Sequence, residues 1–244
     1  MINWFKYAAP QRFYPLAGTL VRWCGWLAAL LTVVGLAIGL LIAPTDFQQG
    51  EAYRIIFIHV PASWMSMVIF VAMAFWSAIG LAFNARLAFM LARALAPTGA
   101  LMCFLALWTG ALWGKPTWGA WWVWDARLTS ELILLFLYLG YLSLHAAIDD
   151  TRRADRAAGV LALVGVVNVP IIYFSVKWWN TLHQGASVSV DAAPRMASIM
   201  LLGMLIMAIA FWLYSIAVTL ARVRILIRER EAEAAWMEQL KETA

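Results

Sequence analysis

Residues 20–42 read LVRWCGWLAALLTVVGLAIGLLI, an apolar run whose single charge is Arg22. A bilayer has a hydrocarbon core about 30 Å thick, which a helix crosses with about 20 apolar residues. This run is therefore long enough for one crossing, and similar runs follow at about residues 62–83, 95–113, 128–144, 159–176 and 197–221. Asn168 and Pro170 interrupt the fifth run, which is the weakest. The sequence predicts one all-α integral membrane domain, residues 1–244, with six transmembrane helices.

The composition agrees with a membrane protein. Hydrophobic residues make up 64% of the chain and charged residues 13%, whereas a soluble domain carries about 25% charged residues. The formal net charge of +5 would suggest nucleic-acid binding in a soluble protein. Here it has a simpler explanation, because cytoplasmic loops of membrane proteins are rich in Lys and Arg.

Lys and Arg are distributed unevenly between the segments that link the runs. One set contains Lys6, Arg12, Arg22, Arg86, Arg93, Arg152, Arg153, Arg156, Arg222, Arg224, Arg228, Arg230 and Lys241, and the other only Arg54, Lys115, Arg127, Lys177 and Arg195. The positive-inside rule then predicts that both termini are cytoplasmic. Segments 43–61, 114–127 and 177–196 face outward, and the charged tail 222–244 is expected to extend the last span as a solvent-exposed helix that caps the protein or contacts a partner.

Several catalytic classes are excluded by what the sequence lacks. Cys24 and Cys103 both fall within predicted spans, and no C-x-x-C-H motif for covalent haem attachment occurs. There is no G-x-x-x-x-G-K-[ST] motif, so the chain is not expected to hydrolyse ATP by the usual route. No plausible nucleophile and base pair is found either, and we expect a protein that is not an enzyme.

The outward segments are unusually rich in tryptophan. Residues 113–129 read WGKPTWGAWWVWDARLT, and Trp178 and Trp179 lie on the same predicted side. An interfacial aromatic belt would distribute tryptophans over all span ends, so a local platform for a planar apolar ligand is the favoured interpretation over a belt or a packing role. If the segment after Pro116 is helical, one helix face carries Trp118, Trp121, Trp122 and Asp125.

Two of the three histidines, His59 and His183, are predicted on this same side. Imidazole is a common axial ligand of haem iron, although a single histidine near an interface is usually a hydrogen-bonded surface residue. His145, at the other side, is expected to be structural. Haem propionates need cationic partners, for which the outward candidates are Arg54, Lys115, Arg127 and Arg195; Arg127 has alternative partners in Glu131 and Asp125.

Residues 118–129, WGAWWVWDARLT, resemble the signature of the tryptophan-rich WWD-domain family, the haem-handling membrane proteins of cytochrome c maturation. The segments ELILLFLYLGYLSL (131–144), IHVPASWM (58–65) and WWNTLHQG (178–185) extend the resemblance over essentially the whole chain. Larger relatives such as CcmF carry more spans and further histidines, so this chain resembles the shorter members.

The resemblance implies that His59 and His183 bind the iron of haem b. It also implies that the loop presenting haem to the chaperone CcmE contains Trp118, Trp121, Trp122, Trp124 and Asp125, with Arg127 beside it. The implied complex in the bacterial inner membrane includes the ATP-binding-cassette pair CcmA and CcmB, of which CcmA is the ATPase, and the small subunit CcmD. Two other classes stay open: a membrane b-type cytochrome that transfers electrons, and a transporter or channel with broken helices.

Overall fold

The computed structural model describes residues 4–183 and 196–242, and six helical segments in these ranges are long and apolar enough to cross a membrane. The all-helical, six-span prediction is thereby confirmed. The segments are α1 (Pro10–Ala37) with the π-helical turn η2 (Ile38–Ile42), the 3₁₀ turn η3 (Glu51–Ile55) with α2 (Ile56–Phe83), α3 (Arg86–Trp118), α4 (Ala126–Ala147), α5 (Thr151–Gly165) with α6 (Asn168–Trp178), and α7 (Ser198–Arg230). A short turn η1 (Trp4–Ala8) precedes them and α8 (Ala235–Glu242) follows.

Most spans are longer than the apolar runs that revealed them. The third run was predicted at 95–113, whereas α3 covers Arg86–Trp118, and the second begins at Glu51 rather than at residue 62. The apolar run marks only the part of a helix that lies in the hydrocarbon core. The helix itself continues into the polar interface, because its backbone hydrogen bonding does not end with the apolar residues. One consequence is that His59 lies inside the first turns of α2 rather than in a loop.

The fifth span is broken where the sequence suggested an interruption. α5 ends at Gly165 and α6 begins at Asn168. Pro170 lies in the first turn of α6, where a missing backbone N–H breaks no helical hydrogen bond. The Asn168 side chain donates to the Ser130 carbonyl at 2.8 Å, which connects the start of α6 to α4.

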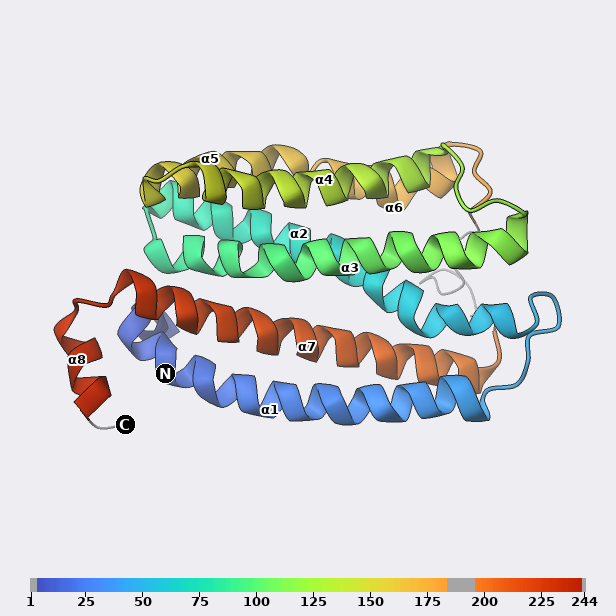
Figure 1. Ribbon diagram of the computed structural model, residues 1–244, viewed down its shortest axis with the longest axis horizontal. Helices are drawn as coiled ribbons and strands as arrows, with labels where there is room; N and C mark the ends of the chain where they lie inside the picture. The colour runs from blue at the N-terminus through green and yellow to red at the C-terminus, as the bar shows by residue number, and fades with distance from the viewer. Residues whose placement is uncertain (1–3, 184–195, 243–244) are drawn as a thin grey trace.

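Two extensive helix pairs organise the bundle: α1 runs along α7, and α2 along α3 (Figure 1). The central core between α2, α3, α4, α5 and α6 contains Phe70, Met73 and Tyr138, all fully buried. Gly99 of α3 faces the Tyr138 ring so closely that a Cβ there would come within 2.2 Å of it. Small residues of this kind let transmembrane helices approach each other.

Phe57 fixes the start of α2 against the other helix pair. Its fully buried ring fits against Gly39 of η2 and Gly203 of α7, where an added Cβ would lie 2.5 Å and 3.0 Å from the ring. Because His59 is two residues further along the chain, this contact also fixes the position of the His59 side chain.

The C-terminal tail differs from the prediction. α7 does continue beyond the last apolar run, to Arg230, but Val223 and Ile227 are buried rather than exposed. The chain then turns, and α8 returns so that Met237 is 3% exposed in a cluster with Tyr14. The expectation of one solvent-exposed helix over residues 222–244 was wrong, because apolar residues spaced along the tail pack against α1 and α3.

Both ends of the chain lie at one end of the bundle, where α2 passes to α3 and α4 to α5 (Figure 1). His145 is at this end, 5.1 Å from the Tyr141 ring and with Nδ1 3.9 Å from an Asp155 oxygen. The opposite end gathers the end of α3, the start of α4 and the end of α6 (Figure 1).

Candidate functional site

At that opposite end the structure brings His59 and His183 together. His59 belongs to α2 and His183 to the segment after α6, and their ring centroids are 6.3 Å apart with an interplanar angle of 34°. Trp113 contacts His59 edge-on at 5.6 Å between ring centroids, and Trp118 lies 6.1 Å from His183. Residues separated by more than a hundred positions in sequence thus form one aromatic cluster.

The tautomer of His59 follows from its hydrogen bond to Thr109 of α3. The Thr109 hydroxyl donates to the Leu105 carbonyl at 2.5 Å, and its oxygen lies 3.1 Å from His59 Nδ1. Since the hydroxyl proton is already used, the oxygen accepts and Nδ1 carries the hydrogen. Nε2 then retains its lone pair, the form in which imidazole binds a metal.

Close packing also fixes the orientation of this imidazole. His59 is 9% exposed, and a Cβ added at Gly110 would come within 3.1 Å of its Cε1 atom. Two neighbouring residues of α3 therefore position His59: Thr109 accepts its hydrogen bond, and Gly110 leaves room for its ring.

The tryptophan-rich loop is not helical. Gly119 has φ +79° and ends α3 at Trp118, and residues 119–125 follow in irregular conformation. The conditional prediction that Trp118, Trp121, Trp122 and Asp125 share one helix face is therefore wrong, because a left-handed glycine terminates the helix.

Within the loop the indoles differ in exposure. Trp121 and Trp124 are 55% and 77% exposed, while Trp118 and Trp122 are only partly exposed. Trp122 packs edge-on against Trp124 at 5.3 Å, and its buried Nε1 has no hydrogen-bond partner among the described residues. A buried N–H without an acceptor is costly, which marks this atom as one that a ligand or partner could satisfy.

Asp125 has two structural roles. One carboxylate oxygen accepts from the Leu128 backbone N–H at 2.8 Å and caps α4. The other accepts a hydrogen bond from the Thr181 hydroxyl, whose oxygen accepts from the His183 backbone N–H at 3.0 Å. Asp125 and Thr181 thus connect the tryptophan-rich loop to the segment that carries His183.

Arg127 is directed into the bundle. It donates to the Ile172 carbonyl of α6 at 2.7 Å and lies 3.5 Å from the Ser63 hydroxyl of α2. Of the carboxylates proposed as alternative partners, Glu131 instead accepts from Ser66 at 2.7 Å. No ion pair joins Arg127 to Glu131 or to Asp125, all of which lie in the described part of the chain.

The other basic candidates have varied surroundings. Arg54 donates to Glu51 and to the Gly39 carbonyl, so it serves the η3 turn. Lys115 donates to the Gly119 carbonyl at 3.1 Å, and its Nζ lies 6.0 Å from the centroid of the exposed Trp121 ring. Arg195 lies outside the described residues.

Sequence reasoning missed Thr109, Thr181 and Gln49, which accepts from the Trp113 indole at 2.7 Å. Thr109 lies in an apolar run that gives no signal of a polar contact with α2. The capping role of Asp125 did have a signal, because an Asp directly before an apolar helical run is a typical N-cap.

Comparisons of the sequence with a family model and with individual proteins agree on one family. The family model for CcmC, heme exporter protein C, matches residues 3–238. The chain is similar to the heme exporter protein C of Escherichia coli K12, with 48% identity over 238 residues, covering 96% of this chain and 95% of that protein. The protein of the same name from Haemophilus influenzae is 44% identical over 244 residues, covering 100% and 99% of the two chains. The one from Bradyrhizobium diazoefficiens is 47% identical over 240 residues, covering 97% and 90%.

Proposed function

The chain belongs to the CcmC family, the heme exporter proteins C of cytochrome c biogenesis, and from this we propose that it holds haem between His59 and His183 and presents it to the chaperone CcmE. Haem b is the cargo in this proposal. The separation of the two imidazoles is the observation that carries it.

The geometry of the histidines suits a shared iron. A first-row metal ion lies about 2 Å from each imidazole nitrogen that binds it, which places the centroids of two opposed imidazoles about 6 Å apart. The observed centroid separation is 6.3 Å. Two imidazoles supply the axial positions of an octahedral iron, and a porphyrin supplies the other four.

The protonation of His59 supports the same role. Thr109 accepts from Nδ1 and so leaves the Nε2 lone pair for a metal. A carbonyl or hydroxyl that orients a ligating histidine in this way is a usual part of metal sites.

The tryptophans provide the apolar surroundings. Trp118 lies beside His183, while Trp121 and Trp124 are exposed at the end of the bundle. We propose that Trp118 and Trp122 bury part of the ring, and that the exposed indoles form the surface that CcmE approaches. Asp125 holds the loop in position, and Arg127 remains the candidate partner for a propionate.

The distribution of basic residues supports a site outside the cytoplasm. The end of the bundle with the histidines is poor in Lys and Arg, and the end with both termini is rich in them. Under the positive-inside rule this charge distribution supports the proposal that the site is at the periplasmic face of the bacterial inner membrane and that the termini are in the cytoplasm.

The contribution of this chain is positioning rather than acid or base catalysis. His59 and His183 orient the haem, the loop orients the chaperone, and bringing the two together in a fixed geometry lowers the entropic cost of their reaction. The energy for release is assigned to the partners CcmA and CcmB, with CcmD as a further subunit of the complex.

An absorption spectrum tests the proposal. The purified chain loaded with haem should show a low-spin Soret band, and His59→Ala and His183→Ala should each weaken or shift it. The control is His145→Gln. His145 is in the last turn of α4, away from the two other histidines, and its replacement should leave the spectrum unchanged. Parent-like spectra in both alanine variants would remove the ligand assignment.

A further inference from the structure

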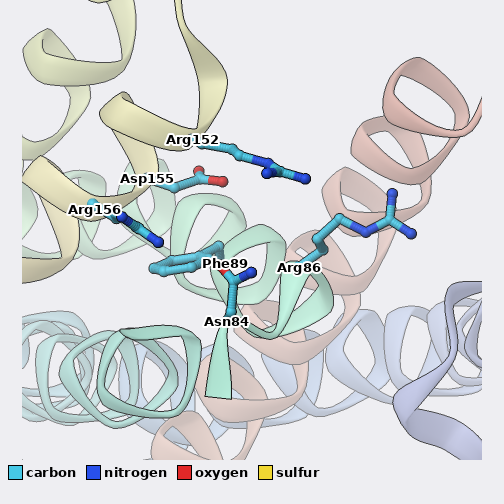
Figure 2. Close-up of a pocket in the computed structure, with 6 residues that line it drawn as sticks. All are labelled: Asn84, Arg86, Phe89, Arg152, Asp155 and Arg156. Atoms are coloured by element: carbon cyan, nitrogen blue, oxygen red, sulfur yellow. The ribbon is translucent and has the colours of Figure 1, made fainter. Parts of the chain in front are cut away.

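A small cavity lies at the end of the bundle opposite the two histidines. It has a volume of about 120 Å³ and is lined by Asn84, Arg86, Phe89, Arg152, Asp155 and Arg156. Figure 2 shows Arg152, Asp155 and Arg156 of α5 on one side of this space, and on the other Asn84 of the turn after α2 with Arg86 and Phe89 of the first turn of α3.

The cavity has a surplus of positive charge. Asp155 is already bound by Arg230 through two contacts of 2.8 Å and 3.0 Å, and Arg86 lies 3.2 Å from Glu231. Arg152 and Arg156 are exposed and form no ion pair with a carboxylate of the described residues. Two guanidinium groups are thus left to bind an anion.

The start of α3 adds to this field. Its N-cap residue is Ala85, and no side chain makes a capping hydrogen bond to the first backbone N–H groups of this helix. The partial positive charge of a helix N-terminus attracts phosphate and carboxylate groups. Asn84, in the left-handed conformation with φ 50°, ends α2 and contributes an amide to the same rim.

The floor of the cavity is apolar. Phe89 is 5% exposed, and its ring occupies space that Gly80 of α2 leaves free, where a Cβ would come within 2.7 Å. Beside the cavity, Phe83 directly before Asn84 is 79% exposed, and Val160 one turn after Arg156 is 53% exposed. At the end of membrane spans, cationic groups suit the phosphate of a phospholipid, and the exposed apolar side chains next to them suit its acyl chains.

We propose that Arg152 and Arg156, with Asn84 and the start of α3, bind the phosphate of an anionic phospholipid whose acyl chains lie along Phe83 and Val160. The cavity is smaller than the roughly 300 to 1,000 Å³ of pockets that enclose whole drug-sized ligands, so it takes a headgroup rather than an entire molecule. Basic pockets between spans are known sites for acidic headgroups. In the proposed topology this end is cytoplasmic, but the lipid site does not depend on the haem proposal.

The test compares two lipids on the full chain. The protein, purified in a neutral detergent, is titrated with phosphatidylglycerol or with phosphatidylcholine of the same acyl chains, and bound lipid is counted by native mass spectrometry. We expect preferential binding of phosphatidylglycerol, weakened at least tenfold in the double variant Arg152→Gln/Arg156→Gln. The matched control is Arg153→Gln, an exposed arginine of the same helix that does not line the cavity and should bind like the parent.

Further arms separate the sources of the anion. Circular dichroism checks that the double variant is folded, and Arg156→Gln alone serves if it is not. Inorganic phosphate that displaces phosphatidylglycerol at millimolar concentration, with no preference between the two lipids, would overturn the lipid assignment in favour of a free anion. Equal losses in the Arg153→Gln control, or undiminished phosphatidylglycerol binding in the folded double variant, would overturn the site itself, as would binding of an acidic partner protein in place of lipid.

Discussion

The carboxylate of Asp125 accepts a hydrogen bond from the hydroxyl of Thr181, and this contact joins the tryptophan-rich loop to the segment of His183. Thr181→Val keeps the shape of the side chain and removes both hydrogen bonds of its hydroxyl. A hydrogen bond to a charged group contributes about 1.5 to 3 kcal/mol, so haem affinity should fall about tenfold or more. Haem titration followed at the Soret band measures this.

Thr117→Val is the control for that substitution. The Thr117 hydroxyl donates at 2.8 Å to the Trp113 carbonyl within its own helix, at the same end of the bundle. Haem affinity in this variant should stay near the parent value, and equal losses in the two variants would contradict the proposed link.

Thr109 should control how well His59 binds iron. Thr109→Val removes the acceptor of the Nδ1 hydrogen, and loss of such a partner typically lowers metal affinity about 10- to 100-fold. Thr109→Ser keeps the hydroxyl and should restore most of the affinity. Thr32→Val, which removes a similar hydroxyl-to-carbonyl bond of 2.8 Å in α1, should have no effect on haem, and a parent-like Thr109→Val would refute the orienting role.

Trp122→Phe separates a binding role of the indole from a packing role. The buried Nε1 hydrogen has no acceptor among the described residues, which costs about 1 to 3 kcal/mol in the free protein. The phenylalanine variant should therefore have an unfolding temperature equal to or above that of the parent, but should retain less haem or load CcmE more slowly. Normal loading together with lower thermal stability would show that Trp122 serves packing alone.

Gly39→Ala should disturb the site from a distance. Its Cβ would come within 2.5 Å of the Phe57 ring, and overpacking of this kind typically costs about 1 to 3 kcal/mol. Because Phe57 sets the start of α2, both the unfolding temperature and haem affinity should fall. Gly25→Ala in α1, with nothing within 4 Å of the added Cβ, should change neither, and a parent-like Gly39→Ala would argue against this anchor.

The six spans could be predicted because a chain in lipid must satisfy its backbone hydrogen bonds internally, so each long apolar run is a helix. The break in the fifth span was visible in Asn168 and Pro170. The sequence predicted only that His59 and His183 lie on the same side of the membrane. The distance between their rings depends on the packing of α2 against α3 and on the path of the chain after α6. The prediction of a helical face in the tryptophan-rich loop was wrong, because the periodicity of the sequence does not reveal that one left-handed glycine, Gly119, ends the helix. The contacts of Thr109 join different spans and leave no trace in local sequence.

The break between α5 and α6 makes the two histidines unequal. His59 is buried within a continuous span, whereas His183 follows an eleven-residue half-helix that Asn168 and Ile172 tie to α4. If a porphyrin is held as proposed, the buried His59 would be the fixed side of its site, and the segment of His183 would be the side where a rearrangement could release it.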